Sequence, residues 1–177
     1  MGNYTFNLLL FNNEIYGLTK GQASPTSDLG MVTKTQPDGV FTIPFNPLTM
    51  AITLDAVFVA RSFSKDIAFT TKLIEEGIRT PGFSLIDVLQ PCVSFNHINT
   101  YKWYGDRVYQ LDSSYDPTDK SKAYEKSMEW GDKIPIGLIF KNSRKTYLDN
   151  VIKPKDLPLI KRKTSIKGIE SLINELY

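Results

Sequence analysis

The sequence predicts an α/β domain built from parallel βαβ units, and two observations lead to this prediction. The 177 residues are 41% hydrophobic and 23% charged, values that suit one globular domain with a hydrophobic core. Short apolar runs alternate with helical patterns in the order strand, helix, strand, helix, strand. Residues 17–44 are rich in Gly, Ser, Thr and Pro and have no helical period. A connection of this length is usually functional or disordered.

The first elements are read from apolar runs and helix-start residues. Residues 4–11 (YTFNLLLF) predict a buried strand that ends at the polar pair Asn12-Asn13. Asn46 as N-cap and Pro47 at the first helical position predict a short helix over residues 47–54. The next run, AVFVA, predicts a compact buried strand at residues 56–60.

A longer helix follows, with Ser64 as its predicted N-cap and Asp66 in its first turn. Apolar residues at helical spacing continue to Ile78, and Pro81-Gly82 ends the helix. The later elements are a strand at 83–89, an aromatic-rich stretch at 95–109, a polar turn at 112–120, a helix at 123–130, a strand at 134–140, a basic segment at 150–167 and an amphipathic helix at 169–176. We therefore predict one domain over residues 1–148 and a basic extension over 149–177.

Composition excludes several classes of protein. A formal net charge of +2 is too small to indicate binding to nucleic acid or to an anionic membrane. No apolar run approaches the roughly 20 residues that a membrane-spanning helix needs. The first residues lack the basic region of a signal peptide. One cysteine cannot form an internal disulfide, which fits a reducing compartment. We expect a cytoplasmic protein.

The segment at residues 12–22, NNEIYGLTKGQ, is the strongest candidate site. Ligands of open α/β sheets bind beyond the carboxyl ends of strands, where this segment is predicted to lie. Gly17 and Gly21 would let the backbone approach a phosphate closely. An Asn oxygen suits a hard cation such as Mg²⁺. Since Asn and Gly are also common in plain turns, these residues alone support a turn and a ligand site equally.

A family resemblance extends from this segment. NNEIYGLTKGQASPT resembles the second half of the thiamine-diphosphate motif in β subunits of the 2-oxoacid:ferredoxin oxidoreductases, the pyruvate synthase group. The resemblance continues through PFNPL (44–48), VFVAR (57–61), LIDVLQPC (85–92), NTYKWYGDRVYQLD (99–112) and EWGDKIPIGL (129–138). It covers nearly everything from Asn12 to about Leu148. It implies the thiamine-diphosphate-binding fold, of which this chain would be the carboxyl-terminal part.

The resemblance also implies residue roles. Asn13 would bind Mg²⁺ through its side-chain oxygen, and Ile15 through its carbonyl. Gly17, Leu18 and Thr19 would lie along the diphosphate and the reacting centre. Lys20 would help to hold an anionic substrate or cofactor group, although a loop lysine is more often simply solvated. No catalytic residue is assigned beyond this set.

Cys92 has two interpretations. A lone cysteine is most often buried as a small hydrophobic residue. The match of LIDVLQPC to the family instead implies that Cys92 is the fourth thiolate of a [4Fe–4S] cluster. The other three cysteines of that family pattern, and the GDG half of the metal site, do not occur in this chain.

The other candidates have plainer readings. His97 is the only histidine and is expected on a surface loop. Ser24 and Ser27 are expected to be turn residues, and Asp87 to make a structural hydrogen bond inside its strand. The aromatic residues Tyr101, Trp103, Tyr104 and Tyr109 are expected to pack in the fold or to lie at a subunit interface rather than to stack on bases. The basic run 161–163 is expected to be a solvated face or a docking tail.

The function implied is the coenzyme-A-dependent oxidative decarboxylation of a 2-oxoacid, pyruvate for example, with electrons passed to ferredoxin. We expect this chain to be inactive alone and to work in an oligomer with the amino-terminal half of the β subunit and with α and, where present, γ subunits. A split subunit, an interrupted gene and a cleaved chain would all explain the absent motifs. The alternatives are a non-redox thiamine-diphosphate enzyme, against which the QPC setting of Cys92 argues, and a non-catalytic assembly fragment.

Overall fold

The computed structural model describes residues 3–151, 169–170 and 173–174. The chain separates into two compact units, Met1–Tyr147 and Leu148–Tyr177. Helix α5 (Tyr147–Val151) closes the continuous part. Within the predicted helix 169–176, the four described residues are helical. Residues 152–168 of the basic segment, with the run 161–163, lie outside the described residues, and the domain boundary after residue 148 stays a prediction.

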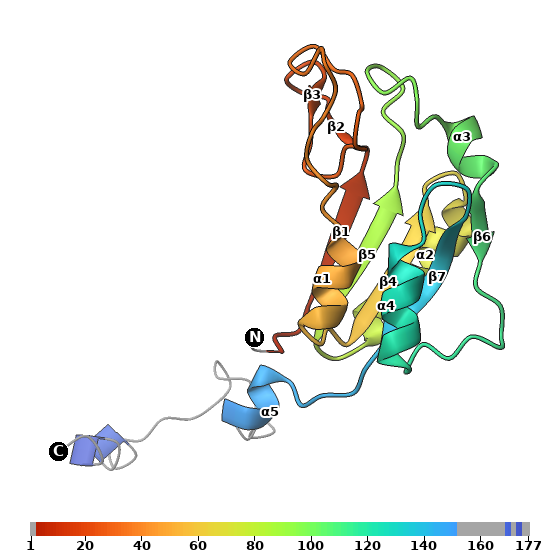
Figure 1. Cartoon of the computed structure of the whole chain (residues 1–177). Helices are drawn as coiled ribbons and strands as arrows, with labels where there is room; N and C mark the ends of the chain where they lie inside the picture. The colour runs from red at the N-terminus through yellow and green to blue at the C-terminus, as the bar shows by residue number, and fades with distance from the viewer. Residues whose placement is uncertain (1–2, 152–168, 171–172, 175–177) are drawn as a thin grey trace. The chain divides into compact units, whose positions relative to one another are not determined.

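Five strands form the main sheet of the first unit, in the order β1-β5-β4-β7-β6 (Figure 1). Strands β1, β5 and β4 are parallel, which confirms the predicted βαβ units. The last long strand, β7, is antiparallel to β4 and parallel to β6, so the sheet is mixed. The strands are β1 (Phe6–Asn12), β4 (Phe58–Phe63), β5 (Phe83–Leu89), β6 (Val108–Gln110) and β7 (Ile134–Lys141).

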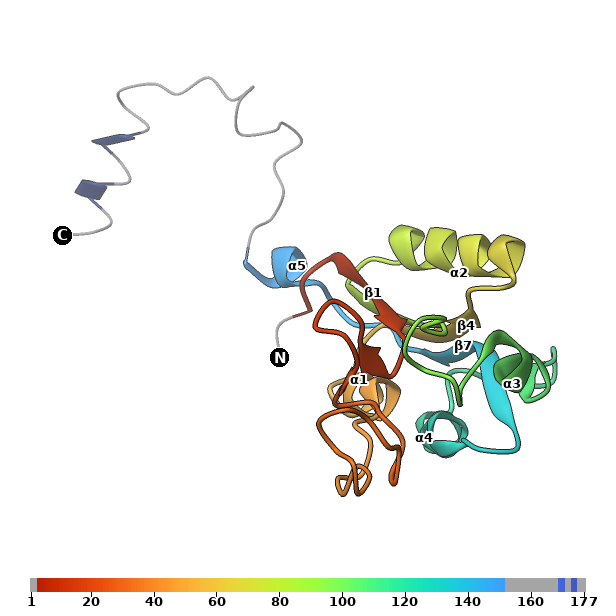
Figure 2. The ribbon, with the colours of Figure 1, turned by 90° about the horizontal axis from the view of Figure 1, so that it is seen from above.

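Helices cover both faces of this sheet, as Figure 2 shows from above. Helix α2 (Ile67–Arg79) packs on one face, where Leu73 joins a buried cluster with Phe58 and Ile86. Helices α1 (Pro47–Thr53) and α4 (Lys120–Met128) pack on the other face. The result is a three-layer α/β fold, in agreement with the predicted class. No helix in the described part of the chain is long and apolar enough to cross a membrane.

Helix starts confirm one predicted cap and correct another. The Asn46 side chain accepts hydrogen bonds from the backbone N–H groups of Leu48 and Thr49, as expected of the N-cap of α1. The predicted N-cap Ser64 is wrong. Its backbone N–H donates to the Leu89 carbonyl, which continues the strand pairing, whereas the Asp66 side chain accepts from the Phe69 N–H and caps α2.

Strand β1 lies at the edge of the sheet, so the predicted burial of residues 4–11 is wrong. Among the described residues β1 pairs only with β5, and no strand lies along its other edge. Phe6, Leu8 and Phe11 are therefore 47%, 44% and 56% exposed. The apolar pattern was correctly assigned to a strand, but an apolar run does not say how many neighbours the strand has.

Three small elements were not predicted, and they position the site. A two-stranded hairpin, β2 (Ile15–Tyr16) and β3 (Gln22–Ala23), follows β1. Helix α3 (Tyr101–Gly105) and strand β6 lie in the aromatic-rich stretch. Figure 1 shows the hairpin and α3 at the end of the sheet to which β1, β4 and β5 point. This carboxyl-terminal edge is where ligands bind in α/β sheets.

Candidate functional site

The predicted ligand turn caps the carboxyl end of β1. It is closed by two backbone hydrogen bonds, from Lys20 N–H to the Gly17 carbonyl (3.1 Å) and from Gly21 N–H to the Tyr16 carbonyl (2.9 Å). Lys20 and Gly21 have φ values of 71° and 101°, in the left-handed region. A Cβ at Gly21 would also lie 3.3 Å from the Phe95 ring. Glycine is thus required at this corner for its conformation and for its small size.

Asn13 and Ile15, the predicted Mg²⁺ ligands, face each other at the start of the turn. The Asn13 Oδ1 atom accepts a hydrogen bond from the Ile15 N–H at 3.2 Å. An amide oxygen has two lone pairs, so one remains for a cation. The Asn13 carbonyl accepts from Asn96 Nδ2 at 3.5 Å. Asn13 is half-buried and Ile15 is buried, so packing against the rest of the domain holds the start of the turn in place.

The other residues of the predicted site form the open side of the turn. Leu18 is 97% exposed, and Thr19 and Lys20 are exposed beside it. Gly17 is half-buried. Leu18, Thr19 and Lys20 therefore lie on the side of the turn that is open to solvent.

Cys92 lies against this turn, far away in sequence. A Cβ built on Gly17 would lie 3.9 Å from the Cys92 Sγ atom. The thiol is half-buried and free. Nowhere in the described ranges do three or more His, Cys, Asp or Glu side chains gather in a way that could hold a metal. The fold therefore brings the two parts of the sequence-predicted site, the turn and the Cys92 thiol, next to each other.

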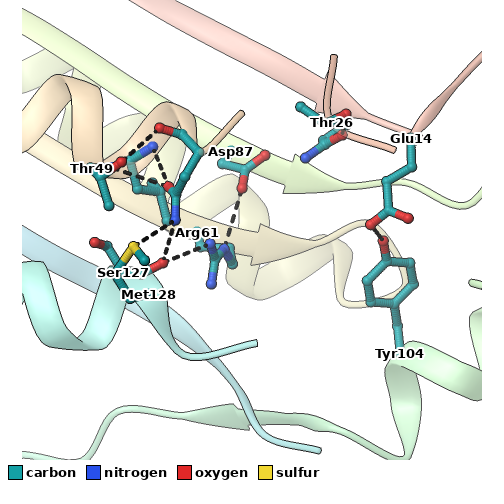
Figure 3. A network of polar contacts seen from close by, with 11 residues as sticks. Glu14, Thr26, Thr49, Arg61, Asp87, Tyr104, Ser127 and Met128 are labelled. Atoms are coloured by element: carbon teal, nitrogen blue, oxygen red, sulfur yellow. Dashed lines mark hydrogen bonds and ion pairs between the residues drawn. The ribbon is translucent and has the colours of Figure 1, made fainter. Parts of the chain in front are cut away.

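Glu14 is the residue that sequence analysis missed. It is 1% exposed, its φ is 58°, and its Oε1 atom accepts a hydrogen bond from the Tyr104 hydroxyl at 2.7 Å (Figure 3). Its Oε2 atom has no partner within the described structure. Burial, with a further contribution from Asp28, raises the pKa of Glu14 to about 8. Only its place between Asn13 and Ile15 could have drawn attention to it.

Residues 24–28 fasten the long connection to the turn. The Thr26 hydroxyl donates to Asn12 Oδ1 at 2.7 Å, and the Ser27 hydroxyl donates to the Glu14 carbonyl. Asp28 accepts from Asn99 Nδ2 and from Trp130 Nε1, each at 3.0 Å. Ser24 donates its N–H to Ser27 Oγ, so both serines are turn residues as predicted. His97 is exposed on a loop, also as predicted.

A buried ion pair lies beneath this region. Arg61 Nε is 3.2 Å from Asp87 Oδ2, and the two side chains are 2% and 1% exposed. This pair confirms the structural role predicted for Asp87, with an arginine as partner (Figure 3). Burial raises the pKa of Asp87, and Arg61 opposes that rise. Both residues line a cavity of about 230 Å³, together with Asn12, Thr26, Asp28, Pro44, Phe45, Asn46, Pro47, Met128 and Trp130.

Comparison with known protein families gives matches to both sequence regions that form this site, the turn after β1 and the region that begins at Cys92. Residues 2–88, with the whole turn, match the family described as "Thiamine pyrophosphate enzyme, C-terminal TPP binding domain". Residues 92–156, which begin at Cys92, match the family described as the C-terminal region of the pyruvate ferredoxin oxidoreductase beta subunit. The 2-oxoacid:ferredoxin oxidoreductase subunit beta of Saccharolobus solfataricus is 43% identical over 151 residues. The chain belongs to the 2-oxoacid:ferredoxin oxidoreductase β-subunit family.

Other members agree with this assignment and set its extent. The 2-oxoacid:ferredoxin oxidoreductase 1, subunit beta, of Aeropyrum pernix is 39% identical over 154 residues, which are 81% of this chain and 48% of that one. The Saccharolobus match covers 79% of this chain and 50% of its relative. A solved 2-oxoglutarate:ferredoxin oxidoreductase from Magnetococcus marinus superposes with a TM-score of 0.82 at 36% identity, over 85% of this chain and 52% of that one. The chain thus spans about half the length of the curated relatives it matches.

The residues of the turn fit the family's cofactor in part. Asn13 Oδ1 offers an oxygen of the kind that Mg²⁺ prefers, and the exposed Leu18–Lys20 stretch leaves the turn open to a ligand. An Fe–S cluster needs four ligands, usually thiolates, and the chain has one cysteine. The described residues fit one side of a diphosphate site and one corner of a cluster site.

Proposed function

We propose that this chain forms part of the thiamine-diphosphate site of a 2-oxoacid:ferredoxin oxidoreductase. The enzyme would oxidatively decarboxylate a 2-oxoacid, transfer the acyl group to coenzyme A and pass the electrons to ferredoxin. The observation that carries the proposal is that Cys92 lies next to the Gly17 turn at the carboxyl edge of the sheet, where a Cβ built on Gly17 would be 3.9 Å from the Cys92 sulfur. It brings the two family-matched regions to one point.

The turn residues would bind and orient the cofactor. The Asn13 side-chain oxygen and the Ile15 carbonyl would hold Mg²⁺, and Gly17, Leu18 and Thr19 would lie along the diphosphate. Lys20, exposed on the same turn, would attract an anionic group of the cofactor or the substrate. Bound thiamine diphosphate supplies the chemistry of C–C bond cleavage next to a carbonyl. The apolar Leu18 side chain would exclude water from one side of that cofactor.

Cys92 would supply one of four ligands to a [4Fe–4S] cluster next to the turn. The three remaining thiolates, and a further oxygen ligand for Mg²⁺, would come from the portion of the β subunit that lies outside the aligned half of its relatives. The full assembly would also include α subunits and, in some members, γ subunits. A reducing cytoplasm suits both a free thiol and an Fe–S cluster.

Purification of the chain with its native partners tests this function. We expect the complex to contain thiamine diphosphate, magnesium and iron, and to reduce ferredoxin when a 2-oxoacid and coenzyme A are both added. Thiamine diphosphate without iron or ferredoxin reduction would instead indicate a non-redox enzyme. A stable complex with neither cofactor would indicate a non-catalytic assembly module, and the proposed function would then be wrong.

A further inference from the structure

Glu14 has an unfavourable backbone conformation in the proposed cofactor turn, residues 12–22. It lies between the two proposed Mg²⁺ ligands, Asn13 and Ile15, and its φ of 58° is in the left-handed region, which a non-glycine residue adopts only at an energetic cost. Such a conformation persists only when the surroundings determine it from several sides. Contacts from outside the turn must therefore hold Glu14 there.

Two contacts reach Glu14 from distant parts of the chain. The Ser27 hydroxyl donates to its backbone carbonyl, and the Tyr104 hydroxyl donates to its side-chain Oε1 at 2.7 Å. Tyr104 is 90 residues away, on α3, and is only 1% exposed. Figure 3 shows its ring pointing from α3 directly at the Glu14 carboxyl group.

The surroundings of Tyr104 make it a rigid support. Its ring packs against Phe63 of β4 (5.7 Å between centroids), Trp103 (5.0 Å) and Trp130 (6.2 Å). Phe63 and Tyr104 belong to one buried cluster with Leu89 of β5. A phenol fixed in this way holds its hydroxyl at one place, so the hydrogen bond defines where the Glu14 side chain must lie.

We propose that Tyr104 is a positioning residue, which sets the geometry of the Mg²⁺–diphosphate turn through its hydrogen bond to Glu14. This proposal rests on the proposed function, because only the proposed function gives the turn a cofactor to bind. Loss of the hydroxyl would leave a buried Glu14 side chain without its only hydrogen bond, since Oε2 already has no partner in the described structure. The turn would then lose the conformation in which the Asn13 Oδ1 atom and the Ile15 carbonyl oxygen are directed at the proposed Mg²⁺ site.

The chain offers a matched control for this contact. Tyr115 also donates its hydroxyl to a buried residue, at 2.6 Å from the Ile139 carbonyl oxygen. This acceptor belongs to strand β7 and not to the cofactor turn. Tyr104→Phe and Tyr115→Phe each remove one hydroxyl and one hydrogen bond. Only the first bond reaches the cofactor turn.

The experiment compares these variants in the purified enzyme complex that contains this chain. We expect Tyr104→Phe to weaken the affinity for thiamine diphosphate and Mg²⁺ about tenfold, as is usual for groups that support metal ligands, and Tyr115→Phe to leave it unchanged. Without cofactor, amide hydrogen exchange at Ile15 and Gly21 should be faster in Tyr104→Phe only. Glu14→Gln, which keeps an acceptor oxygen for the hydroxyl, should bind the cofactor nearly as the wild type does.

The outcomes separate the two proposals. If the wild-type complex binds thiamine diphosphate and Tyr104→Phe binds it as tightly as Tyr115→Phe, the positioning role is overturned and the proposed function stands. If the wild type itself binds none, the proposed function fails and the positioning role fails with it. Should Tyr104→Phe not fold, Glu14→Ala removes the same hydrogen bond from the other side, and unchanged affinity in that variant would equally overturn the proposal.

Discussion

Replacement of Arg61 by methionine should strongly destabilise the chain. Arg61 and Asp87 face each other on adjacent strands, β4 and β5, in direct register. Both side chains are almost completely buried, and Arg61 also donates to the Ser127 carbonyl at 3.5 Å. Methionine fills a similar volume but carries no charge, so the variant leaves the Asp87 carboxylate buried without its cation.

The expected loss is about 3–5 kcal/mol, the usual cost of breaking a buried ion pair from one side. A domain of this size is stable by only about 5–15 kcal/mol, so this change would remove a large part of the total. The double variant Arg61→Met/Asp87→Leu removes both charges and should recover most of the loss, because a buried pair is often replaced by apolar residues at little cost.

The loss should also depend on pH. Burial raises the folded-state pKa of Asp87, so ionisation of this carboxyl costs stability as the pH rises from its unfolded pKa, about 3.9, through the folded value. Arg61 lowers that folded pKa, and its removal lets the pKa rise further. The destabilisation in Arg61→Met should therefore be smallest in acid, where Asp87 is protonated in both proteins, and should grow as the pH rises through the folded-state pKa of Asp87.

Urea unfolding of the wild type, both single variants and the double variant measures these quantities. Lys120→Met, which breaks the exposed pair of Lys120 with Asp55, serves as the control and should leave the urea midpoint nearly unchanged. A loss below about 1 kcal/mol in Arg61→Met, or a double variant as unstable as the sum of the two single variants, would refute the reasoning.

Three further predictions concern the proposed site and the sheet edge. Asn13→Ala in the assembled enzyme should weaken cofactor binding about tenfold or more, whereas Asn13→Asp, which keeps an oxygen, should weaken it less; unchanged affinity by calorimetry would remove Asn13 from the site. Cys92→Ser should bleach or destabilise the cluster, because a hydroxyl replaces a soft thiolate poorly; a normal visible spectrum would return Cys92 to a packing role. The chain alone should either self-associate through β1 or be marginally stable, and should bind the cofactor weakly at best; if it self-associates, Leu8→Lys should lower its mass in light scattering, and a well-folded wild-type monomer with micromolar affinity would contradict this expectation.

Local patterns were sufficient for the longer helices and strands, but not for the β2–β3 hairpin, helix α3 or strand β6. The N-cap of α1 could be predicted because Asn46 and Pro47 act within one turn of the helix they start. Strand β5 (Phe83–Leu89) agrees with the predicted range, since an apolar run between Pro81-Gly82 and Pro91 has few alternatives. The turn at residues 12–22 was found in the same way, because its asparagine and glycine residues are neighbours in sequence.

Long-range contacts could not be predicted in this way. The edge position of β1, the antiparallel direction of β7 and the proximity of Cys92 to Gly17 each depend on which strand lies beside which. The ion pair of Arg61 with Asp87 spans 26 residues, and the Tyr104–Glu14 hydrogen bond spans 90. Hydrophobic periodicity indicates which side of an element is buried, but not which polar group a buried side chain will meet there.

The sequence by itself determined the α/β class, the longer helices and strands and the turn at residues 12–22, because propensities, caps and glycine conformations act over a few residues. Only the tertiary structure decided that Glu14 is buried beneath that turn and that Tyr104 from α3 reaches it. Burial of a polar side chain requires a partner, and the partner is chosen by the packing of the whole sheet and its helices.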